Sequence, residues 1–263
     1  MNHAAAWRPP SVFPSRWLGP ALGAGLVAFL VWNVLNLEVD AARVARGLAR
    51  AGTVFAKAVP PDFDRWELLL EGIVESLQMA TLSTVLGTAL GIPVAVMAAR
   101  NVSPLPVYAL GRTTVSVGRT FHEIIVAIVL VKAVGFGPLA GTLTLTVNSL
   151  GFFSKLLAEQ IEQIDRGQVE AVRATGAGRG AVLIFGVLPQ VLPRIIGLTV
   201  YQWDIHLRQS TIIGIVGAGG IGTTLYNSFS RYDYDFTLAI LLVIVAIVGA
   251  GEWVSAWARQ RIQ

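Results

Sequence analysis

Residues 170–176 read EAVRATG, and after nine more residues 186–189 read GVLP. The first stretch has the composition of a short helix, and Gly176 suits the left-handed conformation that often ends one. Residues 181–187 predict a second short apolar helix, which Pro189 would close. The sequence therefore predicts a compact helix-turn-helix in a loop at 158–193. The most direct use of such a unit is docking against another protein.

The sequence on both sides of this loop is too apolar for a water-soluble domain. Of the 263 residues, 54% are hydrophobic and only 14% are charged, against about 25% charged in an ordinary soluble domain. A helix needs about 20 apolar residues to cross a bilayer. Runs that meet or approach this length lie at residues 17–37, 76–99, 121–135, 139–154, 194–216 and 236–257. We expect an all-α, polytopic membrane protein with about six transmembrane helices.

The chain divides into four parts by composition. Residues 1–16 form an N-terminal cytoplasmic tail, and 17–37 form a first transmembrane helix, because this apolar run exceeds the roughly 7–15 residues of a signal peptide. Residues 38–72 are amphipathic, with apolar residues at helical spacing up to Pro60 and Pro61; they predict an interfacial helix on the outer membrane surface. Residues 73–263 form the core.

The positions of Lys and Arg set the expected orientation. With the N-terminus inside, twelve basic residues flank the cytoplasmic ends of the spans and six flank the outer ends. The two remaining basic residues, Lys132 and Arg208, fall within spans. This bias predicts that both termini and the loop at 158–193 are cytoplasmic.

The loop resembles the "EAA" coupling loop of permease subunits in binding-protein-dependent ABC importers. That pattern is Glu-Ala-Ala, three residues, Gly, nine residues, then Ile-x-Leu-Pro. Five positions of this sequence match it at the correct spacing: Glu170, Ala171, Gly176, Leu188 and Pro189. Val172 is a mild change from the second Ala, whereas Gly186 in place of Ile removes an apolar contact from the second helix. A bare linker would not need this spacing.

Residues 165–171 and 208–222 also look like the phosphonate-uptake permeases, and the similarity runs from about residue 75 to the C-terminus. The resemblance implies a type I ABC importer permease fold in the bacterial plasma (inner) membrane. It also implies a second permease copy, as a homodimer or close heterodimer, with a pair of ATPase subunits and an extracytoplasmic substrate-binding protein. Glu170 and Ala171 would then lie on the docking helix, Gly176 at its turn, and Leu188 and Pro189 at the return into the membrane.

A glycine-rich stretch follows the fifth span and contains Gly217, Gly219, Gly220 and Gly222. It matches the dinucleotide motif G-x-G-x-x-G, but that motif requires a βαβ unit and an acid about 20 residues later, and this sequence has neither. Glycine also permits close helix packing and irregular backbone beside a cavity. Two hypotheses therefore stay open, a constriction of the permeation path and helix packing alone.

Ionisable residues inside a membrane are expensive and mark function by default. Asp204 and Arg208 lie four residues apart, as do Arg119 and Glu123, so each pair can share a helical face. They form either self-neutralising packing pairs or a path in which a guanidinium binds an oxyanion. Asn148 and Ser210 are further polar candidates for this path, although Asn148 more often marks an interhelical hydrogen bond.

The expected function is transport rather than catalysis. The sequence has no Cys, and its three scattered His residues predict no metal site. No P-loop, catalytic triad or cofactor motif is present, so ATP hydrolysis is expected in a separate subunit. Resemblance alone suggests a phosphonate, phosphite or phosphate cargo. Alternatives are an ABC permease for methionine or a quaternary amine, a stand-alone secondary transporter or channel, and, more remotely, a membrane enzyme. No basic run suggests nucleic acid as a partner.

Overall fold

The computed structural model describes residues 17–37 and 40–262, and every regular element in them is a helix. The all-α class is therefore confirmed, and the expected tail at 1–16 lies outside the described residues. The chain divides into two compact units, Met1–Ala56 and Lys57–Gln263. The helices are α1 (Leu18–Asn36), α2 (Ala41–Ala58), α3 (Trp66–Ala98), α4 (Leu105–Thr120), α5 (Glu123–Val134), α6 (Pro138–Glu162), α7 (Arg166–Ala174), α8 (Arg179–Ala181), the π-helical η1 (Val182–Val187), α9 (Leu188–Gly214), α10 (Ile221–Ser230) and α11 (Tyr234–Ile262).

The N-terminal unit holds α1 and most of α2, which differ in kind. Helix α1 contains no charged residue and buries no side chain. Helix α2 is amphipathic: Val44, Leu48 and Phe55 recur at helical spacing among its basic residues. It ends before Pro60 and Pro61, as the sequence predicts. Its location on a membrane surface stays a prediction.

Among the described residues, four helices are long and apolar enough to cross a membrane: α1, α3, the continuous helix Arg179–Gly214 and α11. The pair α4 and α5 makes a fifth if it is one broken span. Helix α6 has 25 residues, or about 37 Å at 1.5 Å per residue, which is long enough to cross. Its sequence is more polar than that of the four helices above, because its buried face carries serine and threonine. These six segments correspond to the six runs expected from the sequence.

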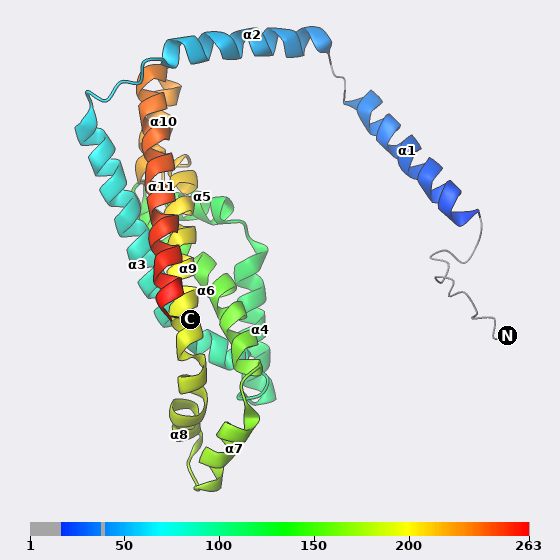
Figure 1. Ribbon diagram of the computed structural model, residues 1–263, viewed down its shortest axis with the longest axis vertical. Coiled ribbons are helices and arrows are strands. Elements are labelled where there is room, and N and C mark those ends of the chain that lie inside the picture. The colour runs from blue at the N-terminus through cyan, green and yellow to red at the C-terminus, as the bar shows by residue number, and fades with distance from the viewer. Residues whose placement is uncertain (1–16, 38–39, 263) are drawn as a thin grey trace, which may run out of the picture. The chain divides into compact units, whose positions relative to one another are not determined.

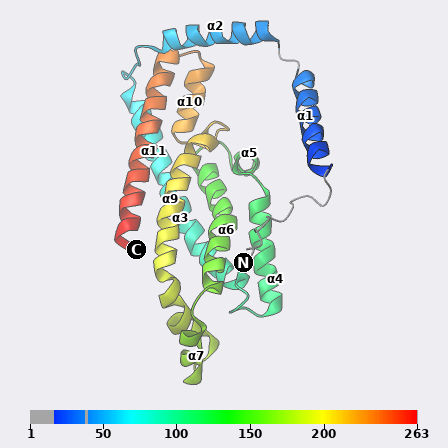
Figure 2. The same ribbon diagram turned by 45° about the vertical axis from the view of Figure 1, so that its right-hand side comes forward.

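The second unit is a bundle in which α3 and α6 pack together most extensively, flanked by α4 and α9, with α11 against α9 (Figures 1 and 2). Small residues allow this close approach. A Cβ added to Gly87 would lie 2.4 Å from Ser149 Cβ, and one added to Gly91 would lie 2.7 Å from the Phe153 ring. Helix α7 lies at one end of this bundle and α10 at the other (Figure 1), and these are called the α7 end and the α10 end below.

Two features differ from the expected helices. The third apolar run does not form a span by itself: α5 has only 12 residues, about 18 Å, and is bent by 89° from α4. The break occurs at Phe121 and His122, where the imidazole of His122 accepts a hydrogen bond from the Ile124 amide at 3.4 Å and caps α5. The second difference is α10, a short helix that the glycine-rich stretch precedes.

Candidate functional site

The loop at 158–193 folds into the expected helix-turn-helix. Asp165 caps α7 by accepting a hydrogen bond from the Gly167 amide at 2.8 Å. Helix α7 ends at Ala174, and Gly176 has a φ of +80°, the left-handed conformation that glycine adopts without strain. Glu170 and Ala171 are exposed on α7, so both are available for contact with another protein.

Gly186 lies in the interface between α7 and η1. Val169 of α7 is buried there, and a Cβ added to Gly186 would lie 3.4 Å from the Val169 Cα and 3.6 Å from the Val172 Cγ2. These are ordinary van der Waals distances, so the two helices are already in contact without an apolar side chain at position 186.

The expectation that Pro189 closes the second helix is wrong. The π-helical segment Val182–Val187 runs directly into α9, and Pro189 lies in the first turn of α9. The proline therefore follows a π-helical irregularity within one continuous helix, and such irregularities accompany interruptions of the regular hydrogen-bond ladder. Leu188 and Pro189 are exposed at the point where the chain re-enters the bundle.

Gln190 connects this unit to α9. Its side-chain oxygen accepts a hydrogen bond from the Asp165 amide at 2.9 Å, and its Nε2 donates to the Gly186 carbonyl at 2.6 Å. The start of α7, the π-helical segment and the first turn of α9 are thereby held by one side chain. Sequence reasoning did not single out Gln190.

Of the two expected ion pairs in the membrane, one forms. Arg208 Nη2 lies 3.3 Å from Asp204 Oδ2 on α9. The Asp204 side chain is 8% exposed and that of Arg208 is 55% exposed, so the guanidinium is open on the helix surface and its partner is not. The second pair does not form: Arg119 lies in the last turn of α4 and Glu123 begins α5, so the bend of 89° falls between them.

The glycine-rich stretch is a tightly packed turn at the α10 end. Gly217, Gly219 and Gly220 all have positive φ. Added Cβ atoms would lie 2.4 Å from the Phe136 ring at Gly217 and 2.6 Å from the Pro138 nitrogen at Gly219. Packing therefore accounts for these glycines, as it does for Gly222, where a Cβ would lie 1.9 Å from the Thr211 carbonyl oxygen.

A pocket of about 320 Å³ adjoins this turn. Glu71 and Glu75 supply its only charged side chains, and Glu75 Oε2 accepts a hydrogen bond from the Gly220 amide at 2.8 Å. The Ser76 hydroxyl accepts a second bond from the Ile221 amide at 3.0 Å. Helix α3 thus caps the start of α10, and the pocket that results is acidic.

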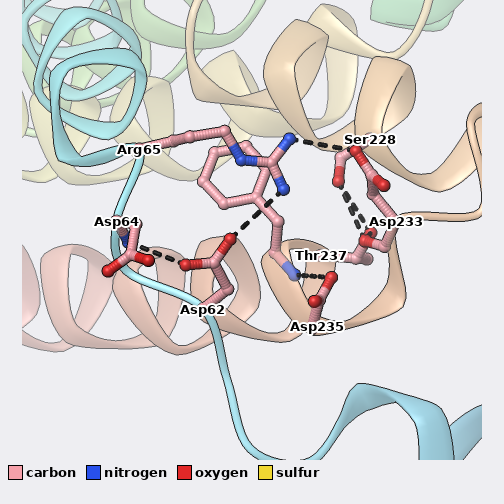
Figure 3. A network of polar contacts seen from close by, with 8 residues as sticks. Asp62, Asp64, Arg65, Ser228, Asp233, Asp235 and Thr237 are labelled. Carbon is pink, nitrogen blue, oxygen red and sulfur yellow. Dashed lines mark hydrogen bonds and ion pairs between the residues drawn. The ribbon is translucent and has the colours of Figure 1, made fainter.

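An ion-pair network beside the pocket joins the start of α3 to the turn between α10 and α11 (Figure 3). Arg65 donates to Asp233 at 2.9 Å and lies 3.5 Å from Asp62, with its guanidinium over the Phe236 ring. Partial burial opposes the charge of Arg65, but hydrogen bonding to Asp233 and the two carboxylates outweigh it and raise its pKa. This network joins the start of α3 to the α10–α11 turn, and its one guanidinium is paired with two carboxylates.

Sequence reasoning missed a buried polar cluster in the middle of the bundle. His206 is 0% exposed and joins α9 to α3 and α6. The Thr84 hydroxyl donates to the Ala80 carbonyl, so it accepts from His206 Nδ1, 2.9 Å away. His206 Nε2 then accepts from Ser149 at 2.8 Å and Gln202 at 2.9 Å. The four-residue spacing of Gln202 and His206 was the available signal.

The other candidate residues have local roles. The buried Ser210 hydroxyl donates to the Leu207 carbonyl at 2.7 Å, and Asn148 on α6 is half-buried. Among the described residues, no group of three or more His, Cys, Asp or Glu side chains could hold a metal ion.

Comparisons with known proteins agree on one family. Residues 91–263 match the family described as binding-protein-dependent transport system inner membrane component. The chain is 43% identical over 211 residues to the phosphate-import permease protein PhnE of Mycolicibacterium smegmatis, covering 80% of this chain but only 40% of that protein. It is 39% identical over 229 residues to the phosphite transport system permease protein PtxC of Stutzerimonas stutzeri, covering 87% of this chain and 82% of that protein.

The fold has solved counterparts as well. A structure of the MetNI methionine ABC transporter in an inward-facing conformation matches 77% of this chain and 99% of its own, with a TM-score of 0.67 and 23% identity. At that identity the likeness concerns the fold alone. It confirms the expected type I ABC importer permease fold.

Proposed function

The chain belongs to the family of binding-protein-dependent transport system inner membrane components, and from this premise we propose that it is the permease subunit of an ATP-driven importer of phosphorus oxyanions. It forms the translocation pathway with a second permease copy. A pair of separate ATPase subunits and an extracytoplasmic binding protein complete the transporter. Both termini and α7 face the cytoplasm.

The observation that carries the coupling role is the exposed face of α7. Glu170 and Ala171 project from a short helix that Val169 and Gln190 tie to α9. A partner that moves α7 therefore also moves α9. This is the connection that an importer needs between ATP hydrolysis and the membrane path.

Relatives supply the support for the cargo. Curated proteins at 39% and 43% identity are named for phosphite and phosphate import. Phosphonate, phosphite and phosphate share a compact anionic group that a guanidinium binds through paired hydrogen bonds. Arg208, exposed on α9 beside a buried Asp204, offers such a group on the predicted path, and Arg119 near the end of α4 is the second candidate.

The test is to purify the tagged chain from its native membrane in mild detergent and to ask whether an ATPase subunit accompanies it. Glu170→Lys reverses a charge on the exposed face of α7, and Gly176→Asp introduces a side chain at a left-handed position. We expect an ATPase with the wild-type chain and its loss from both variants. No ATPase with the wild-type chain would contradict the importer assignment and would favour a stand-alone transporter.

Cargo is tested separately, with the reconstituted complex and its binding protein. Uptake of phosphonate, phosphite or phosphate, with no uptake of methionine, is the expected result. Transport of methionine or a quaternary amine instead would retain the permease assignment and overturn the cargo.

A further inference from the structure

A hollow at the α7 end lies between α6, α9 and α11. It has a volume of about 820 Å³. Its lining combines two arginines and a tyrosine with amides and apolar side chains: Leu156, Gln160, Gln190, Pro193, Arg194, Gly197, Leu198, Tyr201 and Arg259. The volume leaves ample room for a small oxyanion with its water.

The charge in this cavity is positive and uncompensated. Arg194 is exposed and has no ion-pair partner among residues 17–37 and 40–262. Arg259 donates to the Ser255 hydroxyl and lies over the Tyr201 ring at 5.9 Å. No carboxylate lines the cavity, so a bound anion would meet two guanidiniums and no repelling charge.

The cavity lies on the same side of α9 as Arg208. Arg194, Tyr201 and Arg208 follow each other at intervals of seven residues, and each interval rotates the position around an α-helix by only about 20°. All three side chains are exposed. They form one strip, with its two arginines about 21 Å apart along the helix axis.

This strip also reaches the coupling unit. Gln190 lines the cavity and is the side chain that binds Asp165 and Gly186. A change in the position of α7 therefore reaches the cavity wall directly, through one residue.

We infer that Arg194, Arg259 and Tyr201 form a second oxyanion site, which receives the cargo after Arg208 and before its release at the α7 end. This inference rests on the proposed function, because it assigns the anion of the cavity to the transported one. The two guanidiniums supply the hydrogen bonds, and the Tyr201 hydroxyl is a further donor. Movement of Gln190 with α7 alters the site during the transport cycle.

A membrane lipid could supply the same chemistry. Phospholipid headgroups carry a phosphate, and Trp253 and Trp257 of α11 are exposed, as aromatic residues at a membrane interface often are. Basic pockets between helices do bind anionic headgroups. The strip that continues to Arg208 favours the cargo, because a headgroup site would not need to continue along α9.

The experiment uses the complete transporter with its binding protein in phosphatidylcholine vesicles. Methylphosphonate is added inside the vesicles at increasing concentration, and the initial uptake of labelled methylphosphonate is measured. We expect internal anion to slow wild-type uptake by occupying the exit site. In Arg194→Gln and Arg259→Gln, the internal concentration that halves uptake should rise at least tenfold.

Arg261→Gln is the matched control, since Arg261 lies two residues from Arg259, over the Trp257 ring and outside the cavity. It should keep wild-type sensitivity. If Arg194→Gln fails to assemble, Arg259→Gln on a different helix carries the test. Equal sensitivity in wild type, Arg194→Gln and Arg259→Gln, with uptake intact, would overturn the site and leave the proposed function standing.

A second arm separates cargo from lipid by adding phosphatidylglycerol to the vesicles. Wild-type sensitivity to internal methylphosphonate should stay within about twofold. Its loss would assign the cavity to a lipid headgroup and overturn the inference. Failure of the wild-type complex to take up any phosphorus oxyanion would overturn the proposed cargo, and the site with it.

Discussion

The two ends of the bundle carry hollows of opposite charge. The pocket at the α10 end is lined by Glu71 and Glu75 with no basic side chain, whereas the cavity at the α7 end is lined by Arg194 and Arg259 with no acidic one. An oxyanion is repelled at the first and attracted at the second. The close packing of the glycine-rich turn lies beside the acidic hollow, and the proposed anion-binding residues of α9 continue from the basic one.

The largest effect is expected from Gly222→Ala at the α10 end. The added Cβ would overlap the Thr211 carbonyl oxygen, and overpacking of this kind destabilises by about 3 kcal/mol. The thermal melting of the detergent-solubilised protein should fall clearly below that of the control Gly249→Ala, where no atom lies within 4 Å of an added Cβ. Equal melting temperatures would show that the turn is loosely packed and would contradict the role of close packing at the α10 end.

His206→Ala tests the centre of the bundle, between the two hollows. It removes a buried ring and leaves the polar groups of Thr84, Ser149 and Gln202 without their partner. We expect the free energy of unfolding to fall by about 2 kcal/mol, because the substitution leaves a void and unsatisfied polar groups. Hydrogen exchange of α3, α6 and α9 should rise together; protection unchanged in α3 and α6 would contradict a cluster that joins these helices.

Arg208→Gln tests the strip on α9. Losing one charge-assisted, bidentate contact to an oxyanion should lower the uptake rate about tenfold. Assembly with the ATPase should be retained, because the side chain is 55% exposed. Lys155→Gln is the control for general loss of positive charge, since Lys155 pairs with Glu159 on α6. Normal uptake by Arg208→Gln would remove Arg208 from the path.

The smallest effect is expected from Glu75→Gln. The amide oxygen can still accept the hydrogen bond from the Gly220 amide, so the fold is kept while one negative charge is removed from the pocket at the α10 end. Anion uptake at low concentration should rise about two- to threefold, and added salt should reduce the difference because it screens the charge. A decrease in uptake would mean that the acidic pocket assists the cargo rather than repelling it.

The elements that sequence reasoning predicted are those encoded by local patterns. The helix-turn-helix follows from residues 166–189, where Gly176 ends one helix and apolar residues begin the next. The Asp204–Arg208 pair follows from helical spacing. Each needs only one segment of chain.

One missed feature is local. The cap at His122 starts a new helix between Arg119 and Glu123, so their four-residue spacing is not the spacing of one helix. The other missed features depend on several segments together: the His206 cluster draws on three helices, and the basic cavity joins Arg194 to Arg259, 65 positions later in the chain. No single window of sequence contains these last two relations, so only the packed structure reveals them.

The polar cluster at His206 divides α9 into unequal arms. The arm from His206 to Leu188 is about 27 Å long, and the arm from His206 to Gly214 is about 12 Å long. If α9 rotates rigidly about this fulcrum by about 10°, its α7 end moves about 5 Å and its α10 end about 2 Å. A rigid rotation of α9 would therefore convert a large displacement at α7 into a smaller displacement at the glycine-rich turn.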